Sequence, residues 1–329
     1  NGRAHSEPMT RFWRWSTGLF LAVLLLVMAA PLSTARADVS RPVGWDIHTA
    51  TQEVFVGRVV LRYDPSLEDQ AMSLAREIPR AWSEIEHALA GDLDDGLTIH
   101  FVAHSGRIAE GTGMPTWAAG VAHPPTGEIV IAEHAPDGSL TDLDGLLRHE
   151  MAHVALHRAT GGQPLPRWFH EGVAESFGEE IDLMRSQTLA GAVFGAGVPR
   201  LAELEENFRS TDAITATVSY AAARDFVNFL RWRDEDGSDL RQALTLVKQG
   251  KNFESAFVRG FGKALTELDT EWRTGLTGRF MWFPVVSSGG LPMALTFPLV
   301  FVAAARRRRV LRQGWARLEA EDAMMRAAA

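Results

Sequence analysis

The sequence contains no cysteine among its 329 residues and only two tyrosines. Without cysteine the chain can form neither a disulfide framework nor a thiolate metal site. Any zinc ion would therefore have to be held by histidine and carboxylate side chains. The absence of cysteine does not by itself settle the cellular compartment, for which the two ends of the chain are more informative.

Charged side chains are absent from residues 280–305. This stretch is long enough to span a bilayer with some tilt. Arg306 then opens a run of four arginines, and such clusters stay on the cytoplasmic side of a membrane. We therefore predict a transmembrane helix over 280–305 and a basic cytoplasmic tail over 306–329. The alternative for the apolar stretch is a buried core helix.

Residues 1–37 have the pattern of a secretory signal peptide or an uncleaved N-terminal anchor. Arg11 and Arg14 precede an unbroken apolar run at 19–30, and a small-x-small cleavage pattern ends at Ala37. The pattern predicts export of the chain that follows.

Residues 38–279 would then form one extracytoplasmic domain attached to the cell membrane through the C-terminal helix. Both flanking segments are basic, whereas the whole chain carries a net charge of −8. The domain between them is therefore acidic, and we expect no nucleic-acid partner.

A His-Glu-x-x-His motif lies in the apolar segment 146–156. On a helix, His149 and His153 are four positions apart and project from the same face. Two neutral imidazoles suit Zn²⁺, and the neighbouring Glu150 can take a proton from water. The motif therefore predicts a buried zinc helix in which Glu150 is the general base.

A second motif follows in segment 166–177, Pro-Arg-Trp-Phe-His-Glu-Gly-Val-Ala-Glu-Ser-Phe. Glycines and prolines before it end the first helix, so a second helix can fold back against the first. Glu171 can then supply the third ligand of a His₂Glu site. We assign Glu175, one turn further on, to accept the free ring N–H of His149, and we expect His170 to point elsewhere. The alternative for both glutamates is a solvated helix face.

Together, HEMAH at 149–153 and PRWFHEGVAE at 166–175 resemble the gluzincin zinc metallopeptidases, in particular the peptidase MA-like family. The resemblance runs from about Tyr63 to Leu276. It implies an α+β, thermolysin-like zincin domain in which a small mixed sheet and the active-site helix precede a helical C-terminal part. It also implies one Zn²⁺ per chain, bound by His149, His153 and Glu171.

Gluzincins commonly place a tyrosine or histidine from the helical part beside the zinc, as a hydrogen-bond donor to the oxyanion. By this resemblance Tyr220 is a catalytic candidate, and the alternative is an amphipathic core residue. A strand next to the zinc helix pairs with extended substrate in this group, and 118–122 or 128–132 could do so here.

The remaining pattern predicts strands first and helices afterwards. Residues 184–199 are rich in small side chains and glycine, and we expect a loop there. The expected strands are 54–63, 97–103, 117–122 and 128–132, and the expected helices are 65–90, 201–208, 217–230, 239–249, 253–258 and 265–276.

The sequence therefore predicts a membrane-anchored zinc metallopeptidase that acts on a peptide or protein substrate. Two alternatives stay open. One is a hydrolase of non-peptide amides in the cell envelope, and the other is a non-catalytic binding protein with a structural zinc.

Overall fold

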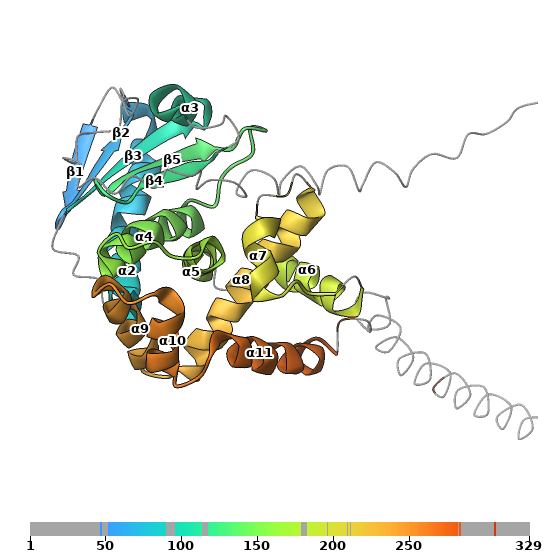
Figure 1. The fold of residues 1–329 in the computed structure, drawn as a ribbon. Coiled ribbons are helices and arrows are strands. Elements are labelled where there is room, and N and C mark those ends of the chain that lie inside the picture. Colours follow the sequence, from blue (N-terminus) through green and yellow to red (C-terminus); the bar gives the residue numbers. More distant parts are fainter. Residues whose placement is uncertain are drawn as a thin grey trace, which may run out of the picture. The chain divides into compact units, whose positions relative to one another are not determined.

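The computed structural model describes a mixed sheet followed by a series of helices (Figure 1). It describes residues 47, 52–89, 96–113, 118–178, 183–195, 197–208, 210, 212–281, 283 and 306. The strands are β1 (Gln52–Val56), β2 (Val59–Tyr63), β3 (Leu97–His104), β4 (Gly120–His123) and β5 (Glu128–His134). The short helices η1 (Pro65–Leu67) and α3 (Gly106–Thr112) and the long α2 (Glu68–Leu89) lie among them.

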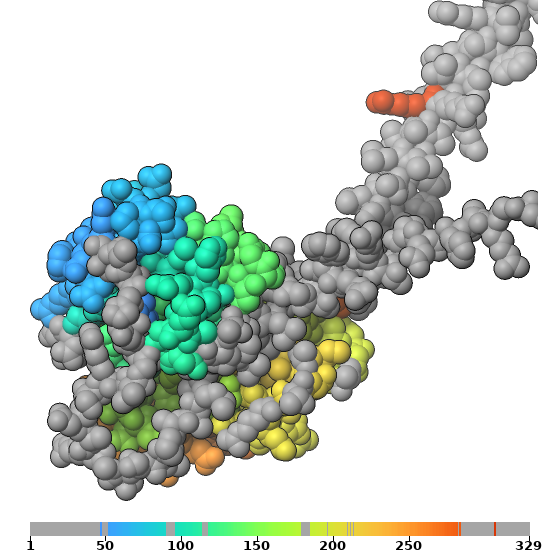
Figure 2. Space-filling model, turned by 90° about the horizontal axis from the view of Figure 1, so that it is seen from above, coloured from blue at the N-terminus to red at the C-terminus, as the bar shows by residue number. Residues whose placement is uncertain are grey.

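The helical part begins with the two motif helices, α4 (Leu143–Thr160) and α5 (Arg167–Gly178). The helices after them are α6 (Leu183–Phe194), α7 (Leu201–Asn207), α8 (Ala213–Arg233), α9 (Ser238–Lys248), α10 (Phe253–Phe261) and α11 (Leu265–Phe280). In the space-filling view the blue-to-green segment that holds the sheet and the yellow segment of the helical part occupy different areas of the visible face (Figure 2).

The sheet has the order β1-β2-β3-β5-β4. The central pairs β2–β3 and β3–β5 are parallel, whereas β1 and β4 pair antiparallel with their neighbours at the two ends. Side chains alternate between the two faces of each strand. Val130 and Ala132 of β5 therefore pack with Ile108 of α3 on one face. The alternate residues of β5 face α4, which lies along the other side of the sheet with α2 (Figure 1).

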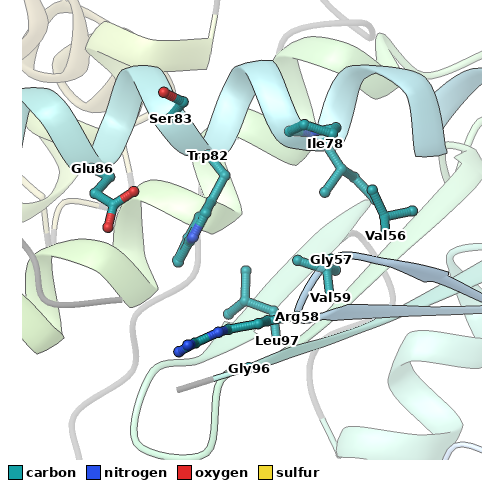
Figure 3. A pocket seen from close by; sticks show the side chains of 11 residues that line it. Val56, Gly57, Arg58, Val59, Ile78, Trp82, Ser83, Glu86, Gly96 and Leu97 are labelled. Atoms are coloured by element: carbon teal, nitrogen blue, oxygen red, sulfur yellow. The ribbon is translucent and has the colours of Figure 1, made fainter. Parts of the chain in front are cut away.

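The first predicted strand, 54–63, is in fact a hairpin of two strands. Gly57 lies in the turn between β1 and β2 with φ +60°, a conformation that glycine adopts without steric cost. A cavity of about 560 Å³ lies between this hairpin and α2 (Figure 3). Trp82 of α2 and Arg58 of the turn are among its lining residues, and no residue of the two motifs is.

The predicted fold class needs one correction. The small mixed sheet, the motif helix and the helical C-terminal part are present, but the transmembrane helix is not supported. Among the residues that the structure describes, no helix is long and apolar enough to cross a membrane. Most of 280–305 lies outside the described residues, as do 1–37 and nearly all of 306–329.

The predicted loop at 184–199 also needs correction, because α6 occupies residues 183–194. Small residues such as Ala190 are fully buried there. Alanine is a strong helix former, and a helix of small side chains can pack closely against a neighbour. Here that neighbour is α8.

Candidate metal and catalytic site

The site is built on α4, whose two ends are set by local sequence. The carboxylate of Asp142 accepts the backbone N–H of Gly145 at 3.2 Å, which caps the N-terminus. Gly161 ends the helix in the left-handed conformation with φ +62°. Between these caps most residues are buried, including the whole stretch 149–156, so the polar motif lies in an apolar interior.

The two motif histidines face each other one turn apart on α4. The Nε2 atoms of His149 and His153 are 3.1 Å apart, and the rings meet edge to face. Burial, reinforced by the positive charge of Arg185, lowers the pKa of His149 to about 3. Burial likewise lowers the pKa of His153 well below its usual value. Both imidazoles are therefore neutral, the form that binds a metal ion.

Glu171 joins them from α5, which packs directly against α4. One ligand atom each from His149, His153 and Glu171 lies within 4.8 Å of the others. Glu171 is 3% exposed, and its buried Oε1 has no hydrogen-bond partner among the residues that the structure describes. Burial raises its pKa to about 7, while Arg167 opposes that shift.

The ligand atoms of these residues are suited to a zinc ion. Ligand atoms of a tetrahedral zinc lie about 3.3 Å apart, close to the separation of the two Nε2 atoms. A buried carboxylate oxygen with no donor is costly, and a cation would satisfy it. Two imidazoles and one carboxylate form the His₂Glu set, which leaves the fourth position open.

Glu150 lies beside this group and is 6% exposed. Burial, with the negative charge of Glu171 added, raises the pKa of Glu150 to about 8. Its Oε1 faces Gly120 at the start of β4, so the edge strand of the sheet runs past the carboxylate.

The sequence predicted that His170 points away from the site, but in the structure its ring contacts His153. Its Nδ1 is 3.0 Å from Nδ1 of His153, and the two rings stack with an interplanar angle of 14°. If Nδ1 of His153 carries the proton and donates to His170, Nε2 of His153 keeps its lone pair for a metal. Sequence reasoning missed this contact because the direction of His170 depends on how α5 packs on α4.

Glu175 is buried on α5 and pairs with Arg185 of α6, whose Nη2 lies 2.8 Å from its carboxylate. Arg185 had no sequence signal, because it lies in the segment predicted as a loop. The predicted bond between Glu175 and the ring of His149 stays a prediction.

Tyr220 lies on α8, which packs against α5. Its ring meets Phe208 edge to face. Its buried hydroxyl lies near Arg167 but has no hydrogen-bond partner of good geometry among the residues that the structure describes. Burial and the negative charge of Glu171 raise its pKa, so the hydroxyl keeps its proton and can donate. Because the charge of Glu171 acts on the Tyr220 hydroxyl, the two groups belong to the same buried region.

The comparison with known families agrees with the motifs. The family model of the peptidase MA superfamily matches residues 96–278, more than half of the chain. The chain belongs to the peptidase MA superfamily. The match begins just before β3 and includes every site residue above, whereas β1, β2 and α2 precede it. No curated protein matches the sequence.

Membership of this superfamily makes the domain a gluzincin-like, peptidase-type domain, as the two motifs predicted.

Proposed function

We propose that this protein is a zinc-dependent metallopeptidase that hydrolyses extended peptides. His149, His153 and Glu171 hold one zinc ion, and Glu150 moves the proton. The observation that carries the proposal is the convergence of two neutral imidazoles and the buried carboxylate of Glu171 beside a second buried carboxylate. In the described part of the chain, Oε1 of Glu171 has no hydrogen-bond partner. Three protein ligands favour an open catalytic site over a closed structural one.

The bound zinc would supply Lewis-acid chemistry, lowering the pKa of a water and polarising the scissile carbonyl. Glu150 accepts the proton of the attacking water and returns it to the leaving amine. In the metal-free protein, burial and the charge of Glu171 raise the pKa of Glu150 to about 8. The positive charge of a bound zinc would lower that pKa again and favour the ionised form, which can accept a proton.

Two residues support these steps. The Tyr220 hydroxyl, which stays protonated, donates to the oxygen on which negative charge develops. Glu175, held by Arg185, accepts the second ring N–H of His149 and fixes the orientation of that ring.

The strand β4 offers a main-chain edge for an extended peptide. It is the last strand of the sheet, and its partner β5 lies between β3 and β4, so β5 has no free edge. Of the two strand segments considered from the sequence, 118–122 therefore fits substrate pairing and 128–132 does not. A strand that is paired on one side only, among the strands that the structure describes, favours a peptide over a non-peptide amide.

The test is Glu150→Gln in the full-length, zinc-loaded protein. The variant keeps the shape of the side chain but cannot accept the proton, so peptide hydrolysis should fall by about 10²–10⁴-fold. Zinc content and melting temperature should stay near those of the wild type. Glu86→Gln, at an exposed glutamate of α2, is the matched control.

A digest of a peptide library shows whether hydrolysis occurs at all. Wild-type protein that binds zinc but cleaves no peptide would favour the structural-zinc or the non-peptide alternative. Full activity of Glu150→Gln would remove Glu150 from the chemistry.

A further inference from the structure

Gly120, the first residue of β4, leaves a space that the Glu150 carboxylate occupies. A Cβ atom built on Gly120 would lie 2.8 Å from Oε1 of Glu150 and 2.7 Å from Cδ1 of Leu146. Both distances are shorter than a carbon atom tolerates. Gly106 offers a contrast, since a Cβ there would meet nothing within 4 Å. Position 120 therefore excludes a side chain because of its neighbours.

The main chain of Gly120 also faces the free edge of the sheet. The carbonyl of Ala119 accepts from the N–H of Ala132 in β5, and Val121 stands opposite Val130. Because backbone groups alternate in direction along a strand, those of Gly120 and Ala122 point away from β5. The backbone of Gly120 thus lies at the edge of the sheet and next to the carboxylate of Glu150.

We propose that Gly120 is a positioning residue that seats the Glu150 carboxylate against the strand along which the peptide lies. The inference rests on the proposed function, because it takes Glu150 as the proton acceptor and β4 as the peptide-pairing edge. Without a side chain at 120, the carboxylate reaches the point where a peptide paired to β4 passes. A methyl group there would push the carboxylate aside, because it is the movable end of a flexible side chain.

The first test is the kinetics of Gly120→Ala in the full-length, zinc-loaded protein. A displacement on the order of 1 Å at a reacting group can cost about 10²-fold. We expect kcat to fall by about that factor, with a smaller change in KM. Zinc affinity should be unchanged, because the atoms nearest to the added methyl belong to Leu146 and Glu150 and not to His149, His153 or Glu171. Gly106→Ala adds the same methyl in open space and should behave as wild type.

The double variant Gly120→Ala/Leu146→Ala separates the two contacts of the added methyl. Removing the Leu146 side chain relieves one contact and leaves the other with Glu150. We expect kcat to stay about 10²-fold below that of Leu146→Ala alone. Recovery to the Leu146→Ala level would overturn the proposal and assign the effect to core packing.

A crystal structure of Gly120→Ala gives a readout that needs no activity. The Glu150 carboxylate should be displaced while the three proposed zinc ligands keep their positions. An unmoved carboxylate, or an unchanged kcat in an active enzyme, would overturn the role of Gly120. A wild-type protein that cleaves no peptide would instead refute the proposed function, and the crystal structure would still decide whether Gly120 seats Glu150.

Discussion

Two buried carboxylates in the helical part of the molecule differ in the hydrogen bonds that they receive from the protein. Asp234 precedes α9 and accepts two backbone N–H groups, from Leu240 at 2.8 Å and Asp239 at 3.2 Å. Glu171 is buried to a similar degree, but none of the described residues gives its Oε1 a hydrogen bond. Asp234 is thus satisfied by the fold, whereas Glu171 is not. A buried carboxylate oxygen without a hydrogen bond lowers the stability of the fold. We therefore infer that Glu171 is positioned to bind a ligand such as a metal ion.

The contrast is sharpest when each carboxylate is removed. Glu171→Ala should weaken zinc binding by more than the roughly 10–100-fold that loss of an outer partner causes. Asp234→Ala should leave zinc affinity unchanged and cost about 1–3 kcal/mol of folding free energy, because two backbone donors lose their acceptor. Competition with a metal chelator and thermal melts measure the two effects. Equal zinc affinity in both variants would show that Glu171 is not a zinc ligand.

The two tyrosines extend the contrast to hydroxyl groups. Tyr63 donates to Gln52 at 3.0 Å. Within the described part of the chain, the hydroxyl of Tyr220 has no acceptor and lies near the cationic Arg167. Tyr220→Phe should lower kcat by about 10²–10³-fold, as expected for loss of an oxyanion donor, and leave zinc content unchanged. Tyr63→Phe is the control and should keep full turnover. A Tyr220→Phe variant with normal kcat would make Tyr220 a core residue only.

The stacked pair His153–His170 predicts a smaller effect on the metal. His170→Ala should weaken zinc binding by about 10–100-fold, because His153 loses the group that fixes its tautomer. His170→Asn should restore part of the affinity, since its carboxamide oxygen can accept from Nδ1. His104→Ala, at an exposed histidine, is the control. If His170→Ala bound zinc as tightly as wild type, the contact would have no role in metal binding.

The stability of the metal-free protein should depend on pH through the buried Glu150. Folding raises the pKa of Glu150 from its ordinary 4.5 to about 8. A carboxyl with a raised pKa contributes its full stability below pH 4.5 and loses that contribution as the pH rises to about 8. Glu150→Gln removes this dependence. Its melting temperature should therefore exceed that of wild type by a few degrees at pH 8, and the two should converge near pH 5. If the melting temperatures of wild type and Glu150→Gln changed with pH in the same way, the pKa of Glu150 would not be raised by folding.

Much of the arrangement could be predicted from local sequence. The spacing of His149 and His153 requires a helix, and the helix breakers after Thr160 allow α5 to return. The pairing of β4 with β5 follows from the turn between them, where the Nδ1 of His123 meets the hydroxyl of Thr126. Each of these signals acts over a few residues, where sequence patterns are most informative.

The contacts that sequence reasoning missed depend on how separate elements pack. His170 reaches His153 because of the rotation of α5 on α4, and Arg185 reaches Glu175 because α6 is a helix. The fit of Gly120 against Glu150 requires the position of an edge strand relative to a helix. Periodicity within one segment carries no information on these tertiary distances.

The most direct test of the account is X-ray absorption spectroscopy of zinc bound to the full-length protein. We predict one zinc per chain, with two imidazole nitrogens at about 2.0–2.1 Å and carboxylate oxygen at about 2.0–2.2 Å, and loss of one imidazole in His149→Ala. A protein that binds no zinc, or a zinc whose ligands are unchanged in His149→Ala and in Glu171→Ala, would contradict the proposed site.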